Sequence, residues 1–80
     1  MGNLTLYMND GTYYQITLSD GKMCSLLDKL IFNDSKYILI TNEDCEELHF
    51  YKRDQKGRYE GYYTKRAVIN LRQITSIREY

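Results

Sequence analysis

The segment Asn9-Asp10-Gly11 constrains the fold of this chain more than any other feature of the sequence. Apolar residues alternate with polar ones on both sides of it, which is typical of half-buried strands. A three-residue loop, with its glycine in the left-handed conformation, pairs Leu6 with Tyr14 on the apolar face. A two-residue loop would instead set Leu6 against Gln15 and mix apolar with polar side chains. We therefore predict a β-hairpin in the first register, with this apolar set: Leu4, Leu6, Met8, Tyr14, Ile16 and Leu18.

A helix is predicted after this hairpin. Ser19 and Asp20 offer side-chain oxygens that can cap a helix N-terminus, and Asn33-Asp34-Ser35 ends the helix. Apolar residues between these signals recur at helical spacing: Met23, Leu26, Leu27, Leu30 and Ile31. We expect this stripe to pack on a sheet with Leu27 in the core. Cys24, one position off the stripe, is expected to be a core or boundary residue.

Strand patterns dominate the rest of the chain. Residues 37–40 form an apolar run without polar alternation, which favours a central strand covered on both faces. An acidic loop is predicted over residues 41–47. A second hairpin follows over residues 48–53 and 58–66, because Asp54 and Gly57 occupy the first and fourth positions of a type I turn. Its predicted register makes most cross-strand pairs attractive: Lys52 with Glu60, Phe50 with Tyr62, Arg53 with Tyr59, and Glu47 with Lys65.

The C-terminal residues predict how the sheet ends. Residues 67–69 form a strand, residues 70–73 a polar bend, and residues 74–79 a closing strand that pairs with residues 4–8. The order is β-β-α-β-β-β-β, an α+β roll or small barrel with one helix packed on a curled, mainly antiparallel sheet. Eighty residues leave room for one core, so residues 1–80 are predicted to form a single domain.

The two cysteines and the N-terminus bear on the compartment. Cys24 and Cys45 have neither CxxC nor metal-ligand spacing, and no N-terminal segment resembles a signal peptide. We therefore expect a cytoplasmic protein with reduced thiols and no membrane segment. Cys45 lies among carboxylates that raise the pKa of its thiol, so we expect it to react slowly.

Charge is distributed unevenly along the chain. The net charge is zero, which argues against a protein whose whole surface holds nucleic acid. Residues 1–48 contain three Lys and eight acidic residues, a net −5, whereas residues 49–80 contain eight Lys or Arg and three acids, a net +5. Such asymmetry indicates halves that attract each other or that meet different partners. The many Ile, Lys, Asn and Tyr residues and the single Ala fit the AT-rich coding of phages and other mobile elements.

No catalytic, metal-binding or cofactor-binding residues are predicted. His49 is the only histidine, and the sequence fixes no acid or nucleophile beside it. The carboxylates and amide of residues 42–47 lack the glycine and spacing of an EF-hand loop. The five glycines are scattered, so no phosphate-binding loop is present. The pattern therefore favours a protein that is not an enzyme.

The remaining candidate is the outward face of the second hairpin. If Leu48, Phe50 and Tyr62 point inward, the outward residues are His49, Tyr51, Arg53, Tyr59, Tyr63 and Lys65. Gly61 is predicted opposite Tyr51, which would leave the Tyr51 ring uncovered. Tyr and Arg in this arrangement suit a protein interface, but also stacking and phosphate contacts with a nucleic-acid strand. A solvated strand face would show the same composition.

The sequence thus predicts a small non-enzymatic binding protein that docks its second hairpin onto another protein, as a stoichiometric inhibitor or accessory protein. The predicted contact residues are Tyr51, Arg53, Arg58, Tyr59, Tyr63 and Lys65. Binding of single-stranded nucleic acid through the same residues is the first alternative. A homo-oligomer joined through an edge strand is the second.

Overall fold

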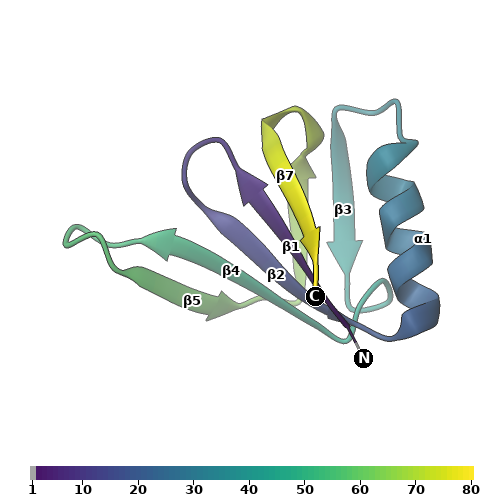
Figure 1. Cartoon of the computed structure of the whole chain (residues 1–80), viewed down its shortest axis with the longest axis horizontal. Helices are drawn as coiled ribbons and strands as arrows, with labels where there is room; N and C mark the ends of the chain where they lie inside the picture. Colours follow the sequence, from purple (N-terminus) through teal and green to yellow (C-terminus); the bar gives the residue numbers. More distant parts are fainter. Residues whose placement is uncertain (1) are drawn as a thin grey trace.

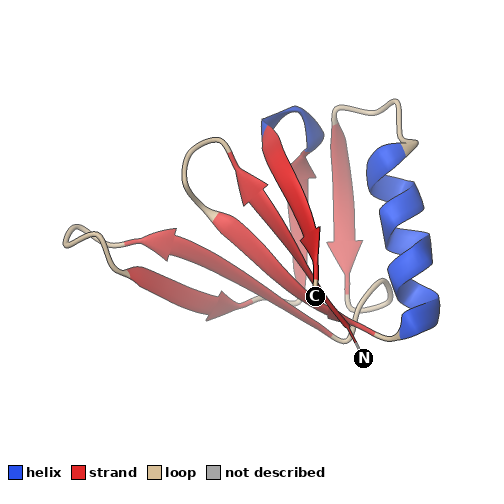
Figure 2. Ribbon diagram, viewed as in Figure 1, coloured by secondary structure: helices blue, strands red, loops and turns tan. Residues whose placement is uncertain are grey.

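The computed structural model describes residues 2–80, which form seven strands, one α-helix and one 3-10 turn (Figures 1 and 2). The helix follows the first two strands as predicted, and five strands come after it, one more than the predicted order contains. The elements are β1 (Gly2–Met8), β2 (Tyr13–Leu18), α1 (Asp20–Ile31), β3 (Tyr37–Thr41), β4 (Glu47–Arg53), β5 (Tyr59–Tyr63), β6 (Arg66–Asn70), the 3-10 turn η1 (Leu71–Gln73) and β7 (Ile74–Glu79). The predicted α+β class is therefore confirmed.

Two antiparallel sheets make up the strand layer. The larger sheet has the order β5-β4-β2-β1-β7, and the smaller one consists of β3 and β6. The β4-β5 hairpin extends away from the helix, toward the left in Figure 1, whereas the helix lies at the right. The fold is an open roll, so the alternative of a closed barrel is wrong. The sheets stay separate because neither β5 nor β7 pairs with a strand of the smaller sheet.

The first hairpin has the predicted register, with Leu6 opposite Tyr14. Gly11 takes a φ of 88°, a left-handed conformation that strains other residues. Asp10 braces the loop, since its Oδ1 accepts hydrogen bonds from the backbone N–H and the hydroxyl of Thr12 at 3.0 and 2.6 Å. The closing strand is also confirmed, because β7 pairs antiparallel with β1.

The helix begins where predicted, but fewer of its apolar residues are buried in the core than the predicted stripe contains. Met23, Leu26 and Leu30 are buried, whereas Leu27 is half-buried and Ile31 is 61% exposed. Successive residues of a helix are rotated by about 100°, so a face centred on Leu26 and Leu30 carries Leu27 to its margin. The expectation that Ile31 belongs to the buried stripe is wrong for the same reason.

Strand β3 is not the central strand that its apolar run suggested. It pairs only with β6, and its residues alternate between buried Ile38 and Ile40 and exposed Tyr37 and Leu39. Only one face of β3 therefore packs on the core. The free edge of β3 faces the helix, where Lys29 Nζ donates to the Leu39 carbonyl at 3.0 Å.

The second hairpin has the predicted turn, since Gly57 N–H donates to Asp54 O at 3.1 Å, and Asp54 N–H donates to Arg58 O at 2.7 Å in the flanking pair. The pairs of Lys52, Phe50 and Arg53 with β5 are confirmed. The predicted pairing of Glu47 with Lys65 is wrong, because β5 ends at Tyr63 and the chain then turns into β6. Glu47 lies opposite Thr17 of β2 instead.

The core lies between the large sheet, the helix and the inner face of the β3-β6 sheet. Its most deeply buried side chains come from every layer: Leu4, Leu6, Ile16, Leu18, Leu26, Ile40, Cys45, Leu48 and Ile69. The opposite face of the large sheet carries no covering layer. Six of the nine tyrosines lie on that uncovered face, three of them half-buried and three exposed.

Adjacent leucines of the helix provide a test of its packing. Leu26→Ala should lower the free energy of unfolding by about 2–5 kcal/mol, because it removes a fully enclosed side chain. Leu27→Ala should cost at least about 1 kcal/mol less, since Leu27 already contacts solvent. Urea unfolding of the two variants measures the difference. Equal losses would contradict this helix orientation.

Candidate partner-binding face

Six tyrosines lie on the uncovered face of the large sheet, which we call the tyrosine face: Tyr7, Tyr13, Tyr51, Tyr59, Tyr63 and Tyr80. They come from β1, β2, β4 and β5, and from the residue after β7. Side chains alternate between the faces of a strand, so the inward Leu6, Tyr14 and Leu48 commit their neighbours to the outward face. The tyrosine face is thus the counterpart of the apolar core.

Ring contacts join Tyr7, Tyr13, Tyr51 and Tyr59 into a row, which the His49 ring extends to Tyr63 and a hydroxyl contact of Tyr7 extends to Tyr80. Tyr13 lies at its centre and stacks on Tyr51, with ring centroids 4.7 Å apart and planes 9° from parallel. The edge of Tyr59 meets Tyr13 at 5.1 Å, and Tyr7 flanks Tyr13 at 5.7 Å. The Tyr59 hydroxyl donates to Gly11 O at 3.1 Å, which ties the second hairpin to the loop of the first. These contacts hold the row in place on the sheet.

The Tyr51 ring is not uncovered, contrary to the expectation from its pairing with Gly61. A Cβ atom added to Gly61 would lie 2.6 Å from Cε1 of Tyr51, so the ring rests on the bare backbone of the glycine. The absence of a side chain at Gly61 lets Tyr51 lie flat against the sheet and stack on Tyr13.

The structure brings four of the six predicted contact residues together. Tyr51, Tyr59 and Tyr63 lie on the tyrosine face, and the Arg53 guanidinium lies 5.1 Å from the centre of the Tyr59 ring. Arg58, by contrast, follows the inward phase of β5, where its Nε lies 3.5 Å from Asp54 Oδ2.

Lys65 also lies elsewhere, because β5 ends before it. It lines a separate hollow together with Thr41, Asn42, Glu43 and Arg66. Neither Arg58 nor Lys65 therefore belongs to the tyrosine face.

Sequence reasoning missed the contribution of the first hairpin and the C-terminus. Tyr7, Tyr13 and Tyr80 complete the row, and the Arg78 guanidinium lies 5.6 Å from the centre of the Tyr7 ring. The alternation that turned Leu6 inward already implied an outward Tyr7. Only the pairing of β2 with β4, which sets Tyr13 opposite Tyr51, joins the two hairpins into one face.

Two shallow hollows flank Tyr7. One of about 390 Å³ lies between Tyr7, Tyr13, Tyr59 and Tyr80, and the other, of about 380 Å³, extends toward Arg78. Burial and the neighbouring tyrosines raise the pKa of Tyr13 above its usual value. Its hydroxyl therefore stays protonated at neutral pH and can both donate and accept hydrogen bonds.

His49 sits at the margin of this face between aromatic rings and an amide side chain. Its ring contacts Tyr51 and Tyr63, with centroids 6.3 and 5.6 Å away, and its cross-strand neighbour on β2 is Gln15. No acid or thiol lies in these positions to act with it. Within residues 2–80, no group of three His, Cys, Asp or Glu side chains is placed to hold a metal ion.

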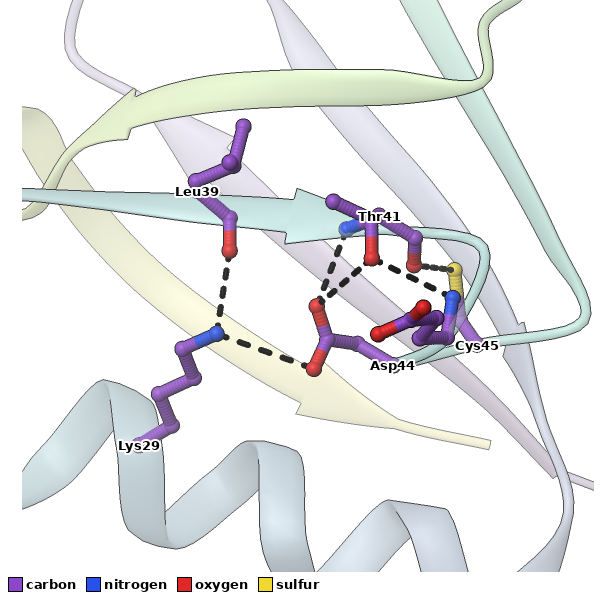
Figure 3. A network of polar contacts seen from close by, with 6 residues as sticks. Lys29, Leu39, Thr41, Asp44 and Cys45 are labelled. Atoms are coloured by element: carbon purple, nitrogen blue, oxygen red, sulfur yellow. Dashed lines mark hydrogen bonds and ion pairs between the residues drawn. The ribbon is translucent and has the colours of Figure 1, made fainter.

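The acidic loop between β3 and β4 connects the end of β3 to the helix through polar contacts (Figure 3). Asp44 Oδ2 accepts the Thr41 N–H at 2.9 Å, and Asp44 Oδ1 lies 3.6 Å from Lys29 Nζ on the helix. The same lysine reaches the Leu39 carbonyl, so one cation joins the loop, the strand and the helix. The Asp44 carboxylate is thus engaged by groups of the protein itself.

The two cysteines are both free thiols, with opposite exposure. Cys45 is buried, and its Sγ lies 3.5 Å from the Thr41 carbonyl. Burial is the main cause that raises the pKa of the Cys45 thiol, with Asp44 and Glu46 adding to it, as predicted from the acidic neighbours. Cys24 is exposed, so its predicted core or boundary position is wrong; it follows Met23 by about 100° of helix rotation, onto the solvent side.

Comparisons with known proteins find no counterpart of this fold or sequence. No family model, no curated protein and no solved structure matches the chain. None of the helices among residues 2–80 has the length and apolar character needed to cross a membrane.

Replacing Gly61 tests whether the glycine positions the tyrosine row. Gly61→Ala should push the Tyr51 ring off the backbone and out of its stack on Tyr13, because the two atoms cannot share that space. Ring-proton NMR shifts of Tyr13 should move toward those of an unstacked tyrosine. Gly21→Ala is the control, since nothing lies within 4 Å of a Cβ there. Unchanged Tyr13 shifts in Gly61→Ala would contradict the role of the glycine.

The contacts of Glu46 should make the stability of the fold depend on pH. Its Oε2 accepts the Ser19 N–H at 2.9 Å, and Oε1 lies 3.3 Å from Lys22 Nζ. The Ser19 hydrogen bond, and Lys22 after it, hold the pKa of Glu46 below its ordinary value. A lowered folded-state pKa stabilises the fold above the unfolded pKa, and this stabilisation is lost as the pH falls through the folded pKa.

Glu46→Gln should therefore lower the melting temperature near pH 7, and the difference from the unsubstituted protein should shrink as the pH falls below about 4.3. Thermal unfolding at pH 7, 5 and 3 measures it. Glu47→Gln is the control, because the Glu47 carboxylate makes no hydrogen bond or ion pair within residues 2–80. A difference that persists unchanged at pH 3 would refute this account of Glu46.

Proposed function

We propose that this chain is a small non-enzymatic binding protein that docks onto a partner protein through the tyrosine face, to which the β4-β5 hairpin contributes Tyr51, Tyr59 and Tyr63. It would act stoichiometrically, as an inhibitor or accessory protein. The observation that carries the proposal is the row of tyrosines that lies outside the core, is held in place by ring stacking, and has no covering layer.

Preorganised tyrosines suit a protein interface for a physical reason. Binding costs the freedom of every side chain that becomes ordered, and rings already stacked on one another have little freedom left to lose. Tyr51 and Tyr59 each offer an apolar ring and a hydroxyl, and Arg53 beside Tyr59 adds a directional donor. Such residues commonly supply most of the binding energy of an interface.

The charge around the face favours a protein over a long nucleic acid. Arg53 and Arg78 are its cations, and they lie beside the separate rings of Tyr59 and Tyr7. The acidic side chains of residues 1–48 would repel a polyanion that extended beyond the hairpin. A nucleic-acid strand remains the second candidate, because an arginine beside an exposed tyrosine ring is also a base-stacking arrangement.

Capture from the native host, followed by mass spectrometry, tests the proposal with matched baits. Tyr59→Ala should weaken binding of the recovered partner by about 2 kcal/mol or more, roughly 30-fold, through faster dissociation. Tyr37→Ala is the control, because Tyr37 is equally an exposed strand tyrosine but lies on β3, outside the tyrosine face. Equal binding by both variants would refute the proposed face.

A salt series then separates the two kinds of partner. For a protein partner, salt should mainly slow association. For a single nucleic-acid strand, affinity should fall with a log–log slope of roughly −0.7 per phosphate contact, and Arg53→Ala should flatten that slope by about one contact. Self-association of the purified chain that Tyr59→Ala leaves unchanged would instead indicate a homo-oligomer joined through an edge strand.

A further inference from the structure

Strand β6 has one free edge. It pairs with β3 on one side, and no strand among residues 2–80 pairs with it on the other. An unpaired edge presents backbone N–H and C=O groups that only water or another extended chain can satisfy. The free edge of β6 faces the open side of the roll. Alternate residues of β6 direct their backbone N–H and C=O groups toward β3 and toward this free edge, so the pairing pattern with β3 decides which residues can bind there.

The phase of the β3-β6 ladder follows from one hydrogen bond at its end. Leu71 N–H donates to Lys36 O at 2.9 Å, which makes these two residues a hydrogen-bonded pair. Hydrogen-bonded and non-hydrogen-bonded pairs alternate along an antiparallel ladder. The pair formed by Leu39 and Val68 is therefore non-hydrogen-bonded. Both backbone polar groups of Val68 point away from β3, toward the free edge.

Two further contacts agree with this phase. The Leu39 carbonyl accepts Lys29 Nζ on the far side of β3, and the Arg66 carbonyl accepts the Thr64 hydroxyl at 2.8 Å on the free side of β6. Arg66 and Val68 share the same phase, so the free edge begins with a satisfied carbonyl at Arg66. Val68 then offers one donor and one acceptor in the middle of the strand.

An aromatic hollow lies directly beside this edge. It has a volume of about 410 Å³ and is lined by the inward side chains of the second hairpin, Phe50 and Tyr62, by Tyr14, and by Ala67 and Val68 of β6. The Tyr14 and Phe50 rings lie 4.9 Å apart and form an aromatic wall. Val68 is 63% exposed and Tyr62 is 44% exposed, large values for apolar residues on a strand.

The charges around the hollow are mostly positive. Arg66 lines it and makes no ion pair within residues 2–80, and Lys52 Nζ lies 5.4 Å from the centre of the Tyr62 ring. Glu60 accepts the Tyr62 hydroxyl at 2.6 Å, and Asp54 also lies near Tyr62, where it helps to raise the pKa of that phenol. Asp54 is paired with Arg58 at 3.5 Å, so Arg66 and Lys52 outnumber the remaining carboxylate and favour an acidic occupant.

We propose that the free edge of β6 binds an extended, acidic peptide segment of a partner protein as an added strand. The peptide backbone would exchange hydrogen bonds with Val68, and every second side chain would enter the aromatic hollow. Its flanking carboxylates would meet Arg66 and Lys52. The added strand would enlarge the β3-β6 sheet to three strands and cover the open side of the roll.

This site differs from the tyrosine face, although Tyr63 lies on that face and also lines the hollow. The hollow uses Phe50 and Tyr62, which point to the opposite side of the β4-β5 hairpin from Tyr51 and Tyr59. The inference therefore does not depend on the proposed function, and each can fail without the other.

A second copy of the chain is the less suitable occupant of the edge. Antiparallel pairing of β6 with its symmetry mate around Val68 would set Arg66 opposite Asn70, and the residue opposite Thr64 would be Arg72. The basic residues Lys65, Arg66 and Arg72 of the two copies would then gather at both ends of the joined strands. Like charges placed close together in a sheet are destabilising, whereas an acidic peptide would neutralise them.

Replacing Val68 tests the proposal without disturbing the β3 ladder. Val68→Pro removes only the outward N–H, and proline is tolerated on an edge strand where that group faces solvent. Val68→Thr keeps the N–H and the strand preference and is the matched control. Both variants and the unsubstituted protein would be used to select from a displayed library of random octapeptides.

The selected peptides should alternate apolar residues and carry Asp or Glu near their ends. A synthetic copy of the most enriched peptide should bind Val68→Pro at least about tenfold more weakly, and Val68→Thr within about twofold. Circular dichroism of Val68→Pro checks that the variant is folded. No enrichment, basic or proline-rich peptides, or equal binding by Val68→Pro would overturn the proposal.

Hydrogen exchange on the unsubstituted protein supplies a readout that does not depend on a variant. The Val68 amide should exchange much faster than those of Ala67 and Ile69 in the free protein, and it should slow when the selected peptide binds. A Val68 amide that is already protected in dilute protein would overturn the proposal. Protection that appears only on dimerisation would assign the edge to a second copy and also overturn it.

Discussion

The pairing of β1 with strands on both of its edges is the constraint on which the structure depends. β1 joins β2, its neighbour in sequence, to β7 at the other end of the chain. Its inward Leu4 and Leu6 are completely buried beneath the helix and the small sheet. Because side chains alternate on a strand, the same packing forces Thr5 and Tyr7 onto the opposite face. The two faces of β1 therefore contribute to different parts of the molecule, one to the core and the other to the tyrosine face.

An 80-residue chain has too little apolar material to cover a five-stranded sheet on both sides. The helix and the β3-β6 sheet cover one face around β1, and they leave much of the β4-β5 hairpin without a layer on either side. Aromatic residues on the outward side of this hairpin stack on the first hairpin, through Tyr13 and Tyr59. Those on its inward side, Phe50 and Tyr62, line the hollow beside β6. Both proposed binding sites thus arise from the same shortage of covering structure.

The uneven charge of the chain is not used to hold its halves together. The three ion pairs among residues 2–80 each join residues of the same half: Lys22 with Glu46, Lys29 with Asp44, and Arg58 with Asp54. The carboxylates of Asp44 and Glu46 in the acidic loop contact the helix and the end of β3. Arg53, Arg66 and Arg78 of the basic half make no ion pair among residues 2–80. This leaves the positive charge on the surfaces that we propose for binding.

Local features follow from the amino-acid sequence alone: the register of both hairpins, the position of the helix, and the placing of Leu6 and Tyr7, and of Phe50 and Tyr51, on opposite faces. Turn residues and the periods of strand and helix act over a few residues, so the sequence pattern predicts them. Three other features depend on long-range packing: β2 lies beside β4, β3 is an edge strand with Leu39 exposed, and β5 ends at Tyr63. These features depend on which distant segments share one small core. Tyr13 therefore belongs to the tyrosine face because β2 pairs with β4, a pairing that the residues around Tyr13 do not predict. Arg58 and Lys65 were predicted to lie on this face, and they lie elsewhere.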